Sequence, residues 1–101
     1  MRKVVGDYRI TKLDKRYNGH KLFRYRVHPF VTTFPHFHIN NNRMFREAFW
    51  WSWEQYGPSL PLHMITADDD FVWAWSTEDF RKQVFFKDDE QLTLFVLAFS
   101  K

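Results

Sequence analysis

An Asn-Gly dipeptide at residues 18 and 19 is the feature that most constrains the fold of this chain. Both residues tolerate positive φ, so the pair favours a two-residue type I′ turn between antiparallel strands. Residues 7–17 and 20–28 flank the turn and are rich in Tyr, Ile, Phe and Val, as strands are. A two-residue turn fixes the register, so the numbers of paired residues should sum to 37. The sequence therefore predicts an N-terminal β-hairpin.

The predicted register divides the side chains of this hairpin between two faces. One face is expected to be mostly core, and it carries Tyr8, Ile10, Lys12, Asp14, Phe23, Tyr25 and Val27. The other is expected to be solvated and basic, and it carries Arg9, Thr11, Leu13, Lys15, Tyr17, His20, Leu22, Arg24, Arg26 and His28.

Two proline steps indicate that the chain leaves regular structure after the hairpin. His28-Pro29 and Phe34-Pro35 each place a residue without an N–H donor after one that is biased towards extended geometry. Residues 29–39 are therefore expected to be irregular or to form an edge strand.

A long apolar helix is predicted over residues 43–56. Asn40–Asn42 supply N-cap candidates before it, and Gly57-Pro58 is a stop signal after it. An apolar arc this wide predicts a helix that is deeply buried or partly covered by a partner. Two adjacent stripes at helical spacing make up the arc: Phe45, Phe49, Trp53 and Tyr56 in one, and Met44, Ala48 and Trp51 in the other.

A second hairpin is predicted in the C-terminal half. Residues 58–69 are expected to form a loop, in which residues 62–66 could form a short strand, before the alternating aromatics Phe71, Trp73 and Trp75. Ser76–Asp79 fits either a turn into a strand over 80–87 or the capping box of a helix. The hairpin is favoured because the segment Gln83–Phe86 is rich in strand-forming residues.

The last segment predicts a helix over residues 88–98. Asp88 and Gln91 form a cap-like start. A fully buried strand over residues 92–99 is the alternative. The helix is favoured by the spacing of Leu92, Phe95, Val96 and Phe99, which is that of one helix face.

Together these elements predict one α+β domain over residues 1–101. Two hairpins form one antiparallel or mixed sheet, and two helices cover one face of it in a two-layer sandwich with the order ββαββα. Aromatic residues make up 21% of the chain, and each buries about 150–250 Å². A core of this kind forms without disulfides, and the chain contains no cysteine.

Composition excludes several classes of protein. No stretch is long and apolar enough to span a membrane, and the first residues lack a signal-peptide core. The apolar fraction of 45% argues against disorder. The absence of cysteine fits a reducing compartment. A soluble cytoplasmic protein is therefore expected. No cofactor is predicted.

Charge is segregated along the chain. Residues 1–26 hold nine Lys or Arg against two Asp, whereas residues 66–101 hold eight acidic residues against four basic ones. The basic hairpin face could neutralise phosphates while an aromatic side chain stacks on a base. A solvated sheet face is the alternative explanation. The candidate nucleic-acid-binding residues are Arg9, Lys15, Tyr17, Arg24 and Arg26.

Three tryptophans within residues 50–53 indicate a protein-binding surface. Successive helical residues turn by about 100°, so these side chains cannot all face the core. Exposed Trp and Arg are frequent anchors of protein contacts. Most of the cluster is expected to be core, and the candidate partner-binding residues are Trp50, Trp51, Arg43 and Arg46.

Histidines and aspartates supply weaker candidates for a metal site. His36 and His38 would point to one side of a strand, with His20, His63 or Asp68–Asp70 as a third ligand. The aspartate run lacks the Gly and Glu positions of a calcium loop and is expected to be a solvated loop. No glycine-rich phosphate loop or nucleophile elbow is present, so no catalytic residue is predicted.

Residues 84–99, VFFKDDEQLTLFVLAF, combine an aromatic strand, an acidic cap and an aliphatic run that ends in an aromatic residue. This segment resembles one near the ends of small, uncharacterised tailed-bacteriophage proteins. The resemblance covers sixteen residues and implies a phage origin and a small accessory role in the host cytoplasm. It carries over no catalytic or binding residue.

The leading hypothesis is a non-enzymatic binding module that contacts a host or viral protein, with a homo-oligomer left open. A nucleic-acid-binding domain that uses the basic hairpin is the alternative. A metal-dependent site at His36 and His38 is the third hypothesis.

Overall fold

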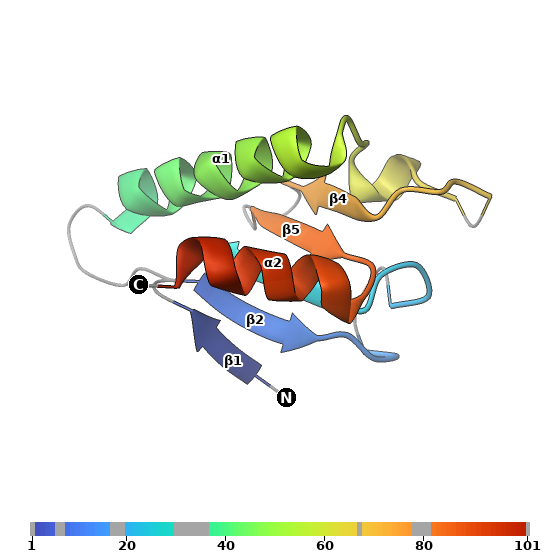
Figure 1. The fold of residues 1–101 in the computed structure, drawn as a ribbon, viewed down its shortest axis with the longest axis horizontal. Coiled ribbons are helices and arrows are strands. Elements are labelled where there is room, and N and C mark those ends of the chain that lie inside the picture. The colour runs from blue at the N-terminus through green and yellow to red at the C-terminus, as the bar shows by residue number, and fades with distance from the viewer. Residues whose placement is uncertain are drawn as a thin grey trace.

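Along the described part of the chain, three strands precede the first helix and two more precede the last one (Figure 1). The computed structural model describes residues 2–5, 8–16, 20–29, 37–66, 68–77 and 82–100, with the backbone alone for 2–5 and 37–40. The elements are β1 (Arg2–Val5), β2 (Tyr8–Lys12), β3 (Tyr25–Pro29), α1 (Phe37–Tyr56), the 3₁₀ helix η1 (Leu62–Met64), β4 (Trp73–Ser76), β5 (Gln83–Phe86) and α2 (Asp89–Phe99). The α+β class is confirmed. The order ββαββα is not, because β1 precedes the two predicted hairpins.

The strands form one five-stranded antiparallel sheet in the order β1-β2-β3-β5-β4. β2 and β3 pair with Tyr8 opposite Pro29 and Lys12 opposite Tyr25, so the predicted sum of 37 is confirmed. The strands themselves are shorter than the predicted segments, and Asn18-Gly19 lies outside the described residues. β5 joins the two halves of the sheet because it pairs with both β3 and β4.

β1 is the strand that the sequence pattern did not predict. Val5 of β1 lies opposite Tyr8 of β2, so only Gly6 and Asp7 separate the two strands in the sequence. Gly-Asp is a dipeptide that favours a two-residue hairpin connection. The signal for β1 was therefore present, although the strand has only four residues and no alternating pattern.

α1 begins at Phe37, so Asn40–Asn42 lie inside the helix and not at its N-cap. An Asn in a helix costs only tenths of a kcal/mol relative to other ordinary residues, and the buried Met44 and Phe45 tie this half of the helix to the core. The end is as predicted: Gly57 follows with a φ of 89°, and its N–H donates to the Trp53 carbonyl at 2.8 Å.

The prediction for residues 29–39 is wrong at both ends. Pro29 is the last residue of β3, which is a central strand and not an edge strand. Residues 37–39 belong to α1. Residues 30–36 lie outside the described part of the chain.

The second hairpin and the second helix are confirmed. β4 pairs with β5, with Trp75 opposite Val84, so the hairpin was the correct alternative to a helix after Ser76. α2 was likewise correctly predicted in preference to a strand. Its start is a reciprocal capping box, in which the Asp88 N–H donates to Oε1 of Gln91 at 2.8 Å and the Asp88 side chain accepts from the Gln91 N–H.

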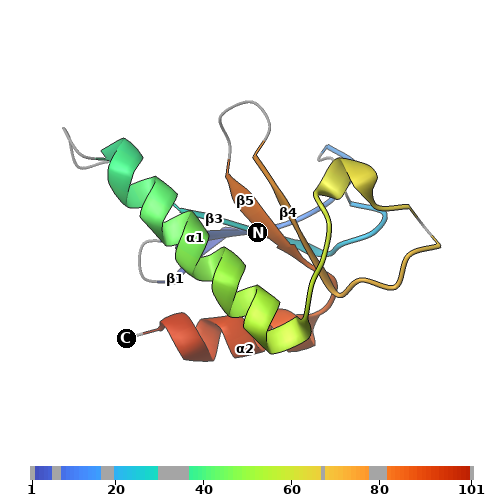
Figure 2. The same ribbon diagram turned by 90° about the horizontal axis from the view of Figure 1, so that it is seen from above.

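Both helices pack on the same face of the sheet (Figures 1 and 2). The hydroxyl of Tyr8 in β2 donates to the carbonyl of Met44 in α1 at 2.7 Å, which fixes the helix to the sheet. The buried residues of this helix-side cluster are Tyr8, Ile10, Val27, Met44, Phe45, Ala48, Trp73, Val84, Phe86 and Phe95.

The opposite face of the sheet is not the solvated surface that the sequence predicted. Thr11 and Leu13 are buried there, and Phe23 contacts Phe85 with ring centroids 6.2 Å apart. Phe23 had been assigned to the helix side, but it precedes β3, which begins at Tyr25, so the alternation of the strand does not apply to it. A second hydrophobic cluster results, with Leu13, Phe23, Ile65, Ala74 and Phe85 buried.

The segment around η1 covers this second cluster. Leu60 and Leu62 pack against it. The strand predicted over residues 62–66 is absent, because residues 62–64 form the 3₁₀ helix and pairing is limited to a single bridge between Pro61 and Trp75. Proline has no N–H to donate, so it cannot extend a ladder along β4.

Candidate functional site

An aromatic column runs from the surface of α1 into the core. Trp50, at the outer end of this column, is 54% exposed. Its ring lies edge-on to Phe49, with centroids 5.1 Å apart, and 5.7 Å from Trp53. Phe49 in turn contacts Trp73 and Trp75 of β4 at 5.5 and 5.3 Å. Trp50 is therefore an exposed side chain that packs against the partly buried rings of Phe49 and Trp53.

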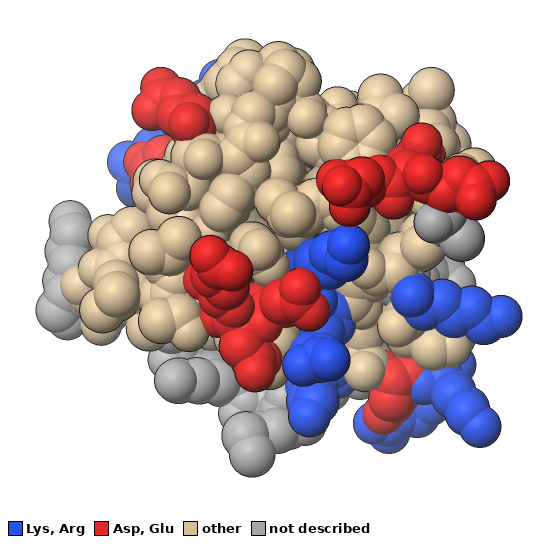
Figure 3. All heavy atoms as spheres, turned by 45° about the vertical axis from the view of Figure 1, so that its right-hand side comes forward, with Lys and Arg blue, Asp and Glu red and all other residues tan. Residues whose placement is uncertain are grey.

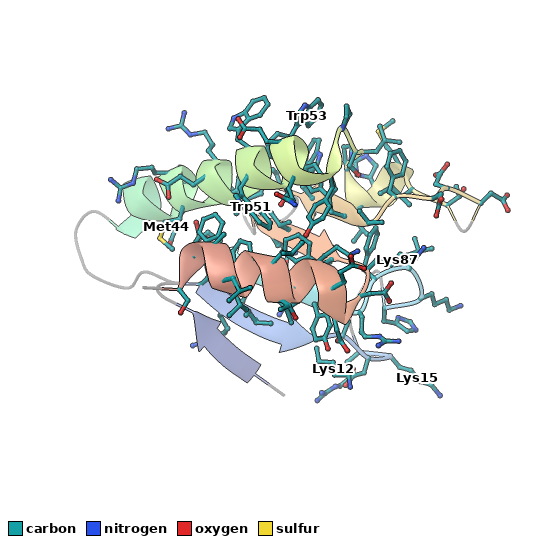
Figure 4. The ribbon with its side chains drawn as sticks, viewed as in Figure 1. Lys12, Lys15, Met44, Trp51, Trp53 and Lys87 are labelled. Carbon is teal, nitrogen blue, oxygen red and sulfur yellow. The ribbon has the colours of Figure 1, made fainter. Side chains whose placement is uncertain are left out.

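Trp51 turns away from this surface. Figure 4 shows it directed from α1 towards α2, whereas Trp53 lies on the other side of the helix. Its ring is 5.6 Å from Phe95 and from Phe99 and 6.4 Å from Phe86. The half-buried Trp51 is thus a contact between the two helices and does not share the exposed surface of Trp50.

Charged side chains flank Trp50 along the exposed side of α1. Arg46 lies one helical turn before Trp50 and Glu54 one turn after it, and all three are exposed. Within the described residues these charged side chains have no ion-pair partner. We call this surface the outer face of α1, and it consists of Arg43, Arg46, Glu47, Trp50 and Glu54.

A second candidate surface is formed by basic residues at one end of the sheet. Figure 3 shows Lys and Arg side chains gathered there, and Figure 4 labels Lys12 and Lys15 among them. Lys12 had been assigned to the core face, but it is the last residue of β2 and is exposed. We call this surface the basic end, and its exposed residues are Lys12, Lys15, Lys21 and Arg24.

The remaining predicted nucleic-acid-binding residues do not belong to the basic end. Arg9 and Arg26 are half-buried on the sheet face opposite the helices, beside the buried Thr11. Tyr17 lies outside the described residues. Of the predicted set, the structure therefore places Lys15 and Arg24 at the basic end, together with Lys12 and Lys21.

Acidic residues from the C-terminal third lie beside the basic end (Figure 3). Nζ of Lys87 is 3.6 Å from a carboxylate oxygen of Asp70. The Tyr25 hydroxyl donates to the carboxylate of Asp89, and this hydrogen bond, together with burial and the nearby negative charge, raises the pKa of Tyr25. The start of β3 and the start of α2, which are far apart in the sequence, are therefore neighbours in the fold.

A local ion pair also neutralises part of the basic connection. Nη2 of Arg16 lies 2.8 Å from a carboxylate oxygen of Asp14. The hydrogen bonds from the Arg16 side chain and backbone to this carboxylate lower the pKa of Asp14 to about 2. Arg16 is consequently not counted as part of the basic end.

The predicted metal ligands lie only partly within the described residues. Residue 38 lies in α1, so the strand alternation that would align it with residue 36 does not apply. His36 and the side chain of His38 lie outside what the structure describes. Among the described side chains, no group of three or more His, Asp or Glu could hold a metal ion.

The acidic run at residues 68–70 forms the solvated loop that the sequence predicted. All three aspartates are exposed. The Asp69 carboxylate accepts the Thr66 N–H at 2.8 Å, and the Asp69 N–H donates to the Thr66 carbonyl at 3.1 Å. The carboxylate of Asp69 thus closes a local turn.

No helix in the described part of the chain has both the length and the apolar character needed to cross a membrane.

Comparison with known proteins found no match among family models, curated proteins or solved structures. The function is therefore inferred from the geometry of the two surfaces.

Proposed function

We propose that this protein is a small, non-enzymatic protein-binding module whose contact surface is the outer face of α1. The observation that carries the proposal is Trp50, which is more than half exposed and yet fixed against Phe49 and Trp53. An anchor that is already ordered loses little conformational entropy on binding. Arg43 and Arg46 lie beside it, and Trp and Arg are the residue types most enriched among such anchors.

The cellular setting of the proposal comes from the sequence. The resemblance of residues 84–99 to a segment of tailed-bacteriophage proteins supports an accessory role in the host cytoplasm, with a host or viral protein as the partner. The charged and aromatic character of the outer face of α1 is compatible with either partner.

Photo-crosslinking from position 50 tests the proposed surface. In cells that express the protein, Trp50→p-benzoylphenylalanine is expected to form a discrete protein adduct that mass spectrometry identifies. Leu97→p-benzoylphenylalanine is the matched control, because Leu97, at 71% exposed, is at least as accessible as Trp50 but lies on α2. With the purified partner, Trp50→Ala should weaken binding by roughly 30-fold or more, as for a central anchor.

Two results would contradict the proposal. The first is the absence of a discrete adduct from position 50. The second is the formation of the same adducts from position 50 as from position 97. An adduct with the mass of two copies of this chain would identify the partner as the protein itself and would still support the surface.

Nucleic-acid binding at the basic end is the second candidate. The gathering of Lys12, Lys15, Lys21 and Arg24 favours it, because phosphate contacts dominate the affinity of nucleic-acid binders. The adjacent carboxylates of Asp70 and Asp89 weaken it, since they lower the positive potential of this end.

A gel shift at low salt decides this second candidate. If the basic end binds nucleic acid, Lys15→Glu with Arg24→Glu should abolish a shift that also disappears as salt rises. Arg43→Glu with Arg46→Glu makes the same change of charge on the outer face of α1 and should leave the shift intact. Absence of any shift with wild-type protein rules the candidate out.

A further inference from the structure

We propose that the partner of the outer face of α1 is a second copy of this chain, with the two α1 helices antiparallel across a two-fold axis at Trp50. This inference rests on the proposed function, because it uses the same surface. It adds the identity of the partner and the register of the contact.

The charges on α1 are arranged as a two-fold interface requires. Such an interface is self-complementary, because the same patch of both subunits meets itself. In an antiparallel pair centred on Trp50, the residue four positions before it faces the residue four positions after it. Arg46 of each copy therefore faces Glu54 of the other, about 6 Å along the helix from the axis.

The monomer leaves both of these charges available. Arg46 and Glu54 are exposed and have no ion-pair partner among the described residues. Arg43 and Glu47 are neighbours one turn apart on their own helix. A parallel pair would instead place Arg46 beside Arg46 and Glu54 beside Glu54, so charge complementarity selects the antiparallel arrangement.

Trp50 supplies the apolar centre of this interface. At the axis the indole of one copy meets the indole of the other, each held on its own Phe49 and Trp53. Burial of a large aromatic side chain at the centre, with charges around it, is the usual anatomy of a protein interface. Trp50 is 54% exposed, and Figures 1 and 2 show α1 at the outside of the fold, so a second helix can approach along it.

The other exposed helix surface lacks these properties. Leu97 of α2 is 71% exposed, and its exposed neighbours Thr93 and Ala98 carry no charge. The exposed charges of α2, Asp89 and Glu90, are both acidic and lie in its first turn, so the described part of this helix offers no opposite charges to pair with a second copy. It therefore provides the control surface for the test.

Sedimentation equilibrium of the purified protein tests the inference. The wild type is expected to show a monomer–dimer equilibrium. Arg46→Glu and Glu54→Arg should each weaken the dimer by roughly tenfold or more, because each creates two repulsive contacts in a symmetric pair. The double variant Arg46→Glu with Glu54→Arg should dimerise as the wild type does. An equimolar mixture of the two single variants should also recover dimer, because their charges are then complementary.

Leu97→Glu is the control variant and should leave the dissociation constant of the dimer unchanged. Circular dichroism should show that every variant is folded. A wild type that stays monomeric at high concentration, or a dimer that both charge reversals leave unaffected, overturns the inference. A monomer that still gives a discrete foreign adduct from position 50 overturns this inference alone, whereas a monomer without any adduct overturns the proposed function as well.

Discussion

Replacing Phe95 with alanine is expected to lower the free energy of unfolding by about 3–5 kcal/mol. Phe95 is 0% exposed. Its ring stacks on Phe99 at 4.3 Å and meets Tyr8 and Trp51 edge-on at 5.2 and 5.6 Å. One side chain thus joins α2 to both α1 and the sheet, and its removal leaves a cavity among rigid rings. Total stability is typically about 5–15 kcal/mol, so the variant should be only marginally folded.

Urea unfolding followed by circular dichroism measures this effect. Leu97→Ala removes a residue of the same helix that is mostly exposed, and it should change stability by no more than about 0.5 kcal/mol. If Phe95→Ala is already unfolded without urea, the smaller truncation Phe95→Leu takes its place in the measurement and should lower the free energy of unfolding by less. A loss below about 1 kcal/mol for Phe95→Ala would show that α2 does not pack on the sheet in solution.

Phe85→Ala is expected to cost a similar amount, about 3–5 kcal/mol, on the opposite face of the sheet. Phe85 is 2% exposed, contacts Phe23 and lies among Leu13, Ile65 and Ala74. A side chain on an open, solvated sheet face would lose little on truncation. The size of the loss therefore reports directly whether the segment around η1 covers this face.

Urea unfolding followed by circular dichroism also measures the effect of Phe85→Ala. Arg24→Ala, an exposed neighbour in the connection between β2 and β3, is the control and should be nearly neutral. A small loss of unfolding free energy for Phe85→Ala would contradict the second hydrophobic cluster. It would indicate that this face of the sheet is solvated, as predicted from the sequence. A large effect with an unchanged Arg24→Ala confirms that both faces of the sheet contribute to stability.

Features that depend on neighbours in the sequence were predictable. The register of β2 and β3 follows from the Asn18-Gly19 signal, and the end of α1 follows from Gly57, because these depend on the backbone preferences of a few adjacent residues. The start of α2 follows for the same reason from the reciprocal bonds of Asp88 and Gln91. The N-terminal end of α1 was not predictable in this way, because core packing outweighs the weak preferences of three asparagines.

For the candidate sites, the sequence identified the types of residue but not the surfaces. It showed that three tryptophans within residues 50–53 could not all be buried on one helix. It did not show that Trp50 is the exposed one, because that depends on where α2 and β4 lie around α1. Glu54 gains its proposed role only from its position relative to Trp50 on the exposed side of the helix.

By itself, the sequence determined the α+β class, the aromatic core, the helix ends marked by Gly57 and Asp88, and the segregation of charge along the chain. Only the tertiary structure decided which face each aromatic covers and which charges meet. The physical reason is that burial and ion pairing between distant segments depend on the packing of whole elements. The basic end and the acidic start of α2 lie far apart in sequence, and they become neighbours because β5 pairs with β3 and leads into α2 beside Tyr25.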